Sequence, residues 1–322
     1  NTEAYIAENK ADNFQAVLWR ELALGRQQVL FWSWFGMEPP GKRMPKFALL
    51  TPGGQQPQEL EAMMPDWESF IQKGKEVYEK SQGKVYMWYG LGDIKQFVQE
   101  QSDQAWVEDG KIDVQKNFGR SIEMIGRFRD EKVSDNLVAW TPAWNEALRG
   151  DEHIFTACAT WSIKFSIESN DPQQKNLGRW GLMSAPEGNA NWGGTAMGIT
   201  KTCKDKRLAW EFLKFATLST EGARALNSMG LMTIAKKPYE EDPSLKSYKS
   251  RWFGDQDLGV YYMEHIIPSI RTRALTLQDG TINDCLSLVL SALNEDPDLT
   301  VEESMELLKE ELKKELPDLE IQ

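Results

Sequence analysis

The spacing of apolar residues along the chain predicts a series of amphipathic helices. Asp66 precedes Trp67 and Phe70 and is expected to be an N-cap, while Gly83 indicates where the same helix ends. In the tail, Val301–Leu316 carries apolar residues at helical spacing among charges, which predicts a surface helix. Further helices are expected at 1–20, 93–102, 117–131, 141–149, 205–218 and 219–228, and the region 257–316 is expected to be helical with loops.

Short aromatic and β-branched runs alternate with these helices and predict strands. The runs lie at 29–35, 85–89, 154–159, 180–184 and 195–200. Residues 36–65 are rich in Gly, Pro and Gln, which indicates a long loop or a connection between lobes. The alternation of strands and helices predicts an α/β fold. Because 322 residues exceed the size at which one hydrophobic core usually stops growing, two lobes are expected.

Charge and composition exclude several classes of function. The net charge of −12 argues against nucleic acid as a partner, since neutralising phosphates requires clustered Lys and Arg. Three cysteines (Cys158, Cys203 and Cys285) and two histidines favour neither a disulfide framework nor a metal site, and no cofactor is expected. No apolar run is long enough to predict a transmembrane helix. The first residues have neither the basic stretch nor the apolar run of a signal segment, which is therefore expected to be absent from this chain.

The content of tryptophan is unusual. Thirteen tryptophans are about three times what average usage would give a chain of this length. Tryptophan offers a broad, rigid apolar face with one hydrogen-bond donor at its edge. Such a face suits the apolar C–H patches of sugar rings, although some of these residues must form the core.

Four stretches resemble the sugar-type extracellular solute-binding proteins of ABC importers, in the family's order and spacing. Asp66–Phe70 is similar to a helix start of the family, and Trp106–Ile112 to a hairpin with a Gly-Lys pair. Ala147–Trp161 resembles the segment that follows. Trp192–Lys201, followed by Ala209–Phe215, resembles the family's glycine pair, crossing strand and next helix.

The resemblance implies a two-lobe periplasmic-binding-protein-like (type II) fold, with hinge strands and a ligand between the lobes. It places residues 1–65 plus 198–234 in an N-terminal lobe, and 66–197 plus 235–322 in a C-terminal lobe. The usual opening of the N-terminal lobe, before the segment resembling Asn1–Trp19, is missing. We therefore expect either a truncated or processed chain or an unusual, incomplete first lobe.

The resemblance also implies a carbohydrate ligand, a membrane permease as partner and a monomer that acts by binding, not as an enzyme. The expected location is extracellular, at the cell surface through an N-terminal lipid, or periplasmic. The many aromatic residues favour an oligosaccharide over a monosaccharide.

The candidate ligand-binding residues are aromatic side chains and their neighbours at the ends of predicted strands. Trp161 follows a strand and begins a helix, where open α/β folds bind ligands, and the family commonly stacks a tryptophan on the sugar here. Trp192 precedes Gly193 and Gly194, which would let the backbone approach a ligand closely. For both tryptophans, core packing is the alternative.

Further candidates are less specific. Trp88 and Tyr89 end a strand, and because side chains alternate, only one should face the cleft. Asp93 follows them and is expected to accept hydrogen bonds from hydroxyl groups. The other candidates, each with core packing as the alternative, are Trp32 and Trp34, Trp144 together with Trp140 as a platform at a helix start, and Trp252 and Tyr261. Trp67 and Trp210 lie in amphipathic helix patterns and are assigned to structure.

Two other functions remain open. A glycoside hydrolase would need two carboxylates facing one another across a cleft, but pairs such as Glu108-Asp109 fall in apparent hairpins or loops. A binding protein for a polyamine or a peptide is the other alternative, and a polyamine site would place several carboxylates around aromatic rings.

Overall fold

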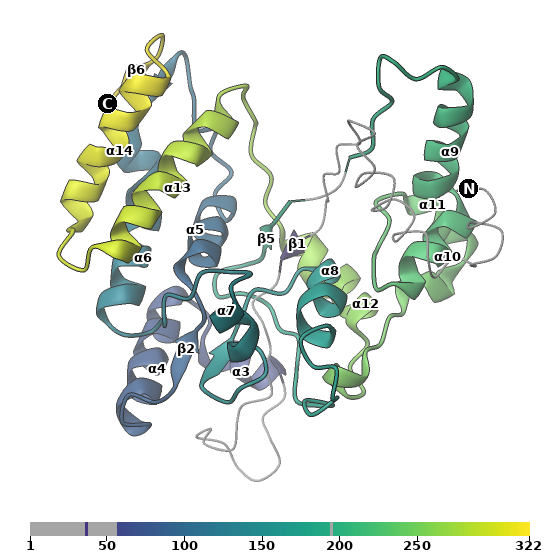
Figure 1. The fold of residues 1–322 in the computed structure, drawn as a ribbon, viewed down its shortest axis with the longest axis horizontal. Coiled ribbons are helices and arrows are strands. Elements are labelled where there is room, and N and C mark those ends of the chain that lie inside the picture. Colours follow the sequence, from purple (N-terminus) through teal and green to yellow (C-terminus); the bar gives the residue numbers. More distant parts are fainter. Residues whose placement is uncertain (1–35, 38–56, 194–195) are drawn as a thin grey trace.

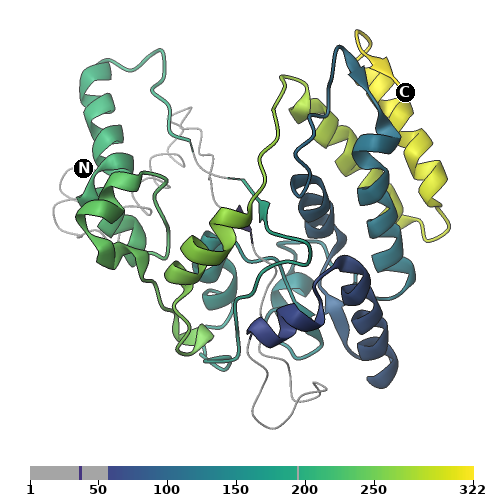
Figure 2. The ribbon, with the colours of Figure 1, turned by 180° about the vertical axis from the view of Figure 1, so that it is seen from behind.

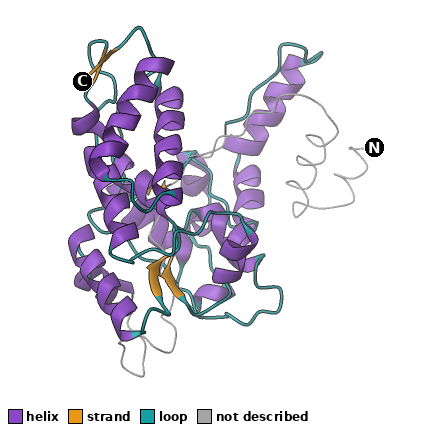
Figure 3. Cartoon of the chain, turned by 60° about the vertical axis from the view of Figure 1, so that its left-hand side comes forward, coloured by secondary structure: helices purple, strands orange, loops and turns teal. Residues whose placement is uncertain are grey.

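The computed structural model describes residues 36–37, 57–193 and 196–322 (Figure 1). The predicted helix at 1–20, the predicted strand at 29–35 with Trp32 and Trp34, and Gly194 lie outside these described residues. The described chain is mainly helical, with a few short strands, as Figure 3 shows.

The helix predicted after Asp66 is confirmed as α4 (Trp67–Lys80). The Asp66 carboxylate accepts a hydrogen bond from the Ser69 backbone N–H at 2.7 Å, and Ser69 in turn accepts from the Asp66 backbone N–H. This reciprocal capping satisfies two donors that the first helical turn leaves without intrahelical partners. Gly83 follows the helix with φ of 77°, a conformation that glycine adopts without steric cost.

The other predicted helices also form, with ends within a few residues of those expected. They are α5 (Leu91–Glu100), α6 (Val114–Asp130), α7 (Pro142–Ala147), α9 (Lys206–Leu218), α10 (Thr220–Ser228), α13 (Asp279–Glu295) and α14 (Val301–Glu315). Shorter helices are α3 (Pro57–Met63), α8 (Thr160–Ser162), α11 (Lys236–Glu241) and α12 (Leu258–Tyr261), and π-helical turns continue α8 at Ile163–Glu168 and α12 at Tyr262–Ile266.

The strands of the described ranges are short and pair in three separate ladders. β2 (Tyr86–Trp88) runs parallel to β4 (His153–Phe155), and Trp88 also bridges Ser134 in parallel. The remaining ladders join β1 (Gly36–Met37) with β5 (Ala190–Asn191) antiparallel and β3 (Lys111–Ile112) with β6 (Glu320–Ile321) parallel. The predicted strands at 85–89 and 154–159 are thus confirmed in shorter form.

The strand predicted at 180–184 does not form. Residues 181–185 have no regular structure, because a side chain takes the place of a neighbouring strand at Leu182. The Gln256 amide accepts from the Leu182 backbone N–H at 2.7 Å and donates to its carbonyl at 2.7 Å. The predicted crossing strand at 195–200 is likewise absent over the described residues 196–200.

Aromatic side chains fill the core on one side of β2 and β4. Phe70 of α4 packs edge-on against Trp88, with ring centroids 5.7 Å apart, and stacks on Phe128 of α6 at 5.9 Å. Helices α13 and α14 extend this core through side chains such as Leu286 and Leu308, both fully buried. Figures 1 and 2 show α5, α6, α13 and α14 grouped on this side of the molecule.

Helices α9, α10 and α11 form a second group, set apart from the first in Figures 1 and 2. α11 is tied to α10 by a hydrogen bond from Thr220 to Glu241. The apolar residues of α9 include Phe215, whose side chain is 52% exposed. The division of the chain into the two predicted lobes stays a prediction.

No helix among the described residues has the length and apolar character needed to cross a membrane.

Candidate functional site

Three chain segments meet where the parallel strands end. β2 leads into α5, whose first turn carries Asp93, and β4 leads through Ala157 to α8. The third segment follows Ser134, which bridges Trp88 in parallel, and leads to α7. All three therefore reach the carboxyl edge of the same small sheet, the edge at which open α/β folds bind ligands.

Four tryptophans from these segments and from the chain after β5 form a continuous column. Trp161 lies in the middle: its ring stacks on Trp192 with centroids 5.2 Å apart and planes at 20°, and on Trp140 at 5.7 Å and 22°. Trp140 also contacts Trp144, at 5.2 Å and 45°. These separations and angles are those of favourable offset-stacked and tilted aromatic pairs.

Local hydrogen bonds position the two ends of the column. Trp140 has φ of 69°, which is unusual for a bulky residue, and lies in the turn just before α7. The Thr141 hydroxyl closes this turn by donating to the Val138 carbonyl at 2.7 Å and caps α7 by accepting from the Trp144 backbone N–H at 3.3 Å. At the other end, the Gln96 amide of α5 donates to the Asn191 carbonyl at 3.0 Å, next to Trp192.

A small hollow lies within the column. Its volume is about 20 Å³, room for about one water molecule. It is lined by the four tryptophans and by Asp93, Ala139, Ala157, Ala159, Ser162 and Ser166. Trp140 is 52% exposed, Trp161 and Trp192 are half-buried, and Trp144 is buried, so the column borders solvent at one end.

Two polar groups that line this hollow have no partner among the residues that the structure describes. The Ser166 hydroxyl, on a residue that is 3% exposed, makes no hydrogen bond to any described residue. Asp93 is half-buried and likewise has neither an ion pair nor a hydrogen bond within the described part of the chain. Although part of Asp93 reaches solvent, the surrounding protein raises the pKa of its carboxyl group to about 7 by desolvating the charged form.

The raised pKa of Asp93 predicts a pH-dependent cost in stability. Between pH 3.8, the ordinary pKa, and about 7, the folded protein keeps a proton that the unfolded chain has lost, so the stability contributed by this group falls as pH rises. We expect Asp93→Asn, which removes the charge, to raise the melting temperature at pH 8 by roughly 2–4 °C and to change it little at pH 4.

The matched control is Asp103→Asn, at an exposed carboxyl group beyond the end of α5. It should leave the difference in melting temperature between pH 4 and pH 8 as in the parent protein. An Asp93→Asn variant with the same pH dependence as the parent would show that this carboxyl group is not desolvated.

Four of the residues proposed from the sequence are brought together: Asp93, Trp144, Trp161 and Trp192. Trp140, considered with Trp144 as a platform, joins them at the exposed end. Sequence reasoning missed Ser166, because it comes five residues after Trp161 and faces the hollow only through the π-helical turn Ile163–Glu168. No feature of the sequence signalled that turn.

Trp88 and Tyr89 are placed differently from the expectation that one of them faces a cleft. Both are fully buried, Trp88 in the core against Phe70 and Tyr89 on the opposite face, where its hydroxyl donates to the Ala147 carbonyl at 3.2 Å. The physical reason is that β2 is covered on both faces, as strands of parallel sheets usually are. Alternation therefore directs the two side chains into two buried layers.

The remaining candidates lie outside the column. Trp252 donates from Nε1 to Asp171 at 3.0 Å, and the buried Tyr261 donates from its hydroxyl to Glu61. Both belong to the smaller core cluster around Trp180 and Leu258. Gly193 is exposed with φ of 78°, so the chain turns immediately after Trp192 in a conformation suited to glycine.

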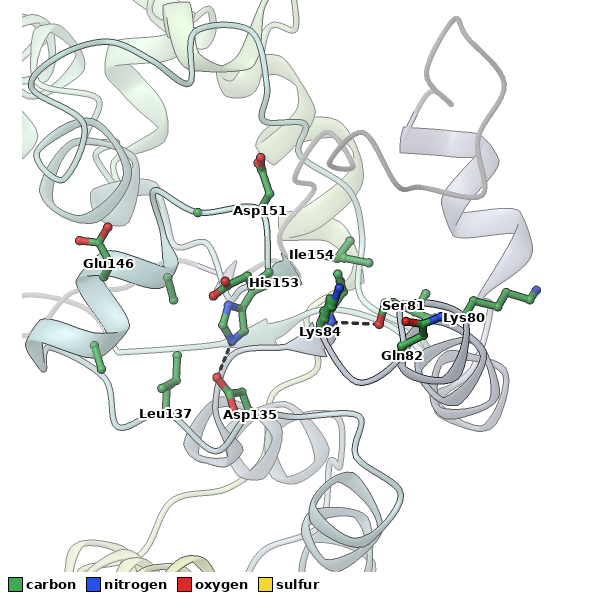
Figure 4. Close-up of a pocket in the computed structure, with 16 residues that line it drawn as sticks. Lys80, Ser81, Gln82, Lys84, Asp135, Leu137, Glu146, Asp151, His153 and Ile154 are labelled. Atoms are coloured by element: carbon green, nitrogen blue, oxygen red, sulfur yellow. Dashed lines mark hydrogen bonds and ion pairs between the residues drawn. The ribbon is translucent and has the colours of Figure 1, made fainter.

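A larger pocket of about 960 Å³ lies near the amino ends of β2 and β4 (Figure 4). His153 lines it, with Nε2 2.8 Å from an Asp135 carboxylate oxygen and its ring between those of Tyr86 and Tyr89. The described residues that line this pocket include no tryptophan. It lies at the end of the strands away from the tryptophan column, and its walls offer apolar side chains and mixed charges.

No group of three or more His, Cys, Asp or Glu side chains within the described ranges is arranged to hold a metal ion.

The chain matches a known family over more than half of its length. The family model described as bacterial extracellular solute-binding protein matches residues 55–251. No curated protein matches the chain in sequence.

Solved structures of similar fold come from the same kind of protein. An extracellular solute-binding protein of family 1 is 18% identical, with a TM-score of 0.71 over 88% of this chain and 72% of that one. The galacto-N-biose/lacto-N-biose I-binding protein of a Bifidobacterium longum ABC transporter is 14% identical (TM-score 0.61; 92% and 71% covered). A Streptococcus pneumoniae solute-binding protein in complex with the blood group A-trisaccharide is 16% identical (TM-score 0.62; 88% and 70% covered).

Proposed function

The chain belongs to the family of bacterial extracellular solute-binding proteins, and from this premise we propose that it binds a carbohydrate at the tryptophan column and delivers it to the permease of an ABC importer. The observation that carries the proposal is the column itself, with Trp140, Trp161 and Trp192 stacked at the carboxyl edge of the sheet. Indole faces bind the apolar C–H faces of sugar rings, and the polar groups beside them orient the hydroxyls.

The size of the hollow bears on how a sugar binds. With room for about one water molecule, its 20 Å³ do not admit a pyranose ring between Trp161 and Trp192. A ring that enters there separates these two indoles, whereas Trp140 offers exposed indole surface without rearrangement. Binding is therefore expected to change tryptophan fluorescence.

The ligands of proteins with a similar fold support a carbohydrate as the ligand of this chain. The Bifidobacterium longum protein was solved with lacto-N-biose, and the Streptococcus pneumoniae protein with a blood group trisaccharide. A Listeria monocytogenes substrate-binding protein of similar fold (TM-score 0.57) was solved with cycloalternan. With the long column, these favour an oligosaccharide.

A binding role, not hydrolysis, suits the residues of the site. Glycoside hydrolysis uses two carboxyl groups about 5–10 Å apart, and Asp93 is the one acidic residue among those described that line the hollow. We therefore propose that the chain is not an enzyme. Its family is extracellular, and we propose that it acts as a monomer outside the cell membrane, anchored by a lipid or free in the periplasm.

The proposal is tested by a thermal-shift screen against neutral mono- and oligosaccharides, read together with tryptophan fluorescence. A ligand that binds only the folded state at about 100 times its Kd stabilises that state by about 2.7 kcal/mol, which corresponds to a rise of roughly 5–10 °C in melting temperature. We expect at least one oligosaccharide to produce such a rise and a fluorescence change. A screen in which peptides or polyamines stabilise the protein and no sugar does would refute carbohydrate binding.

A further inference from the structure

We infer that the carbohydrate bound at the tryptophan column carries a positively charged nitrogen, as an amino sugar does, and that this nitrogen pairs with Asp93. The inference rests on the proposed function and adds the chemical class of the ligand. It comes from a single arrangement: a carboxylate that no described residue pairs with, in a hollow lined by four tryptophans.

The surroundings of Asp93 provide no positive charge among the described residues. Burial alone raises the pKa of the Asp93 carboxyl group, and no neighbouring cation lowers it. Lys95, two residues further along α5, is directed elsewhere: its ammonium group donates to Asn283 at 2.8 Å and to Ser287 at 3.1 Å on α13. Asp93 therefore has no counter-ion among the described residues, and removing a carboxylate from water without one costs free energy.

The indole rings determine which ligand would offset that cost. Ring faces carry negative electrostatic potential and attract cations, most strongly for tryptophan. A neutral sugar hydroxyl gains little from such faces beyond apolar contact. Trp161 turns its faces to Trp140 and Trp192, so a cation reaches an indole face at the exposed Trp140 or where the ligand separates the stacked rings. There an ammonium group gains from the ring and from the Asp93 carboxylate together, which favours a cationic ligand over a neutral one of the same shape.

Ser166 supplies a second polar partner. Its hydroxyl lines the same hollow, and no described residue bonds to it. An ammonium group has three donors, which can be shared between the Asp93 carboxylate, the Ser166 hydroxyl oxygen and water. A carbohydrate ring that separates Trp161 and Trp192 would lie against broad indole faces, which suit it better than a bare polyamine. The described residues that line the hollow also include one carboxylate, not several.

The test compares matched sugars whose nitrogen is either a charged ammonium group or a neutral acetamide. Oligomers of glucosamine and galactosamine, one to four units long, and their N-acetylated counterparts are titrated calorimetrically at pH 7.4 against the protein and its Asp93→Asn variant. We expect at least one amino sugar to bind about tenfold or more tightly than its acetylated counterpart, which corresponds to about 1.4 kcal/mol. In Asp93→Asn this preference for the amino sugar over its acetylated counterpart should shrink to about threefold or less.

Rising ionic strength should reduce the preference of the parent protein for the amino sugar over its acetylated counterpart, since salt screens a partly exposed charge pair. Equal affinity for charged and acetylated ligands, or a preference that survives in Asp93→Asn, would overturn the inference. If neutral oligosaccharides bind while no amino sugar binds better than its acetylated counterpart, the inference fails and the carbohydrate function stands. If spermidine binds and no sugar of either kind does, both fail.

Discussion

Trp161→Ala is expected to weaken carbohydrate binding about 30- to 1,000-fold, or about 2–4 kcal/mol. Trp161 is the central ring of the column and stacks on both Trp140 and Trp192. Truncation to alanine removes its own indole face and the support that holds its two neighbours in place. Calorimetric titration with the sugar found by the thermal-shift screen measures the effect, and a circular dichroism spectrum confirms that the variant is folded.

The matched control is Trp210→Ala. Trp210 lies on α9, is 51% exposed and is assigned to structure, so its removal deletes an indole of similar accessibility to Trp140 from a different part of the molecule. We expect its sugar affinity to remain within about twofold of the parent. If Trp161→Ala binds the sugar as tightly as Trp210→Ala, the column is not the carbohydrate site.

Arg273→Ala should produce the largest loss of stability, about 3–5 kcal/mol, which is the usual cost of breaking a buried ion pair. The Arg273 side chain is 5% exposed and bonds to Asp279 at the start of α13, with Glu100 at 3.7 Å at the end of α5. Its guanidinium carbon also lies 3.6 Å above the ring of Trp106. Alanine leaves two largely buried carboxylates facing one another without a cation, and it removes the cation–π contact.

Thermal unfolding measures this effect, and we expect the melting temperature to fall by roughly 6 °C or more. Arg224→Ala is the control, because Arg224 pairs with Asp242 at 2.9 Å while its own side chain is 55% exposed. Exposed pairs contribute about 0–1 kcal/mol, so this variant should melt within about 2–3 °C of the parent. A similar small effect for both variants would show that the Arg273 cluster does not stabilise the fold.

Much of the helical structure was predictable from the sequence, because helix ends and apolar faces are local properties. Asp66 and Ser69 cap α4 through atoms three residues apart, and the glycine at position 83 ends it. The strand at 180–184 was wrongly predicted, since its backbone bonds to Gln256, a residue 74 positions away from Leu182. Pairing of an extended segment depends on what lies beside it, which a local pattern does not record.

For the site, the sequence by itself identified the kind of chemistry and the segments that carry it. An excess of tryptophan, the placement of Trp161 and Asp93 after strands, and the family motifs all follow from residue type and order. Only the tertiary structure decided which aromatic side chains a ligand can contact. Trp88 is buried because helices cover both faces of its strand. Trp192 stacks on Trp161, 31 positions away in the sequence, because β5 and the hydrogen bond from Gln96 hold its segment there. Burial and stacking depend on contacts between distant segments, and these arise only when the chain folds.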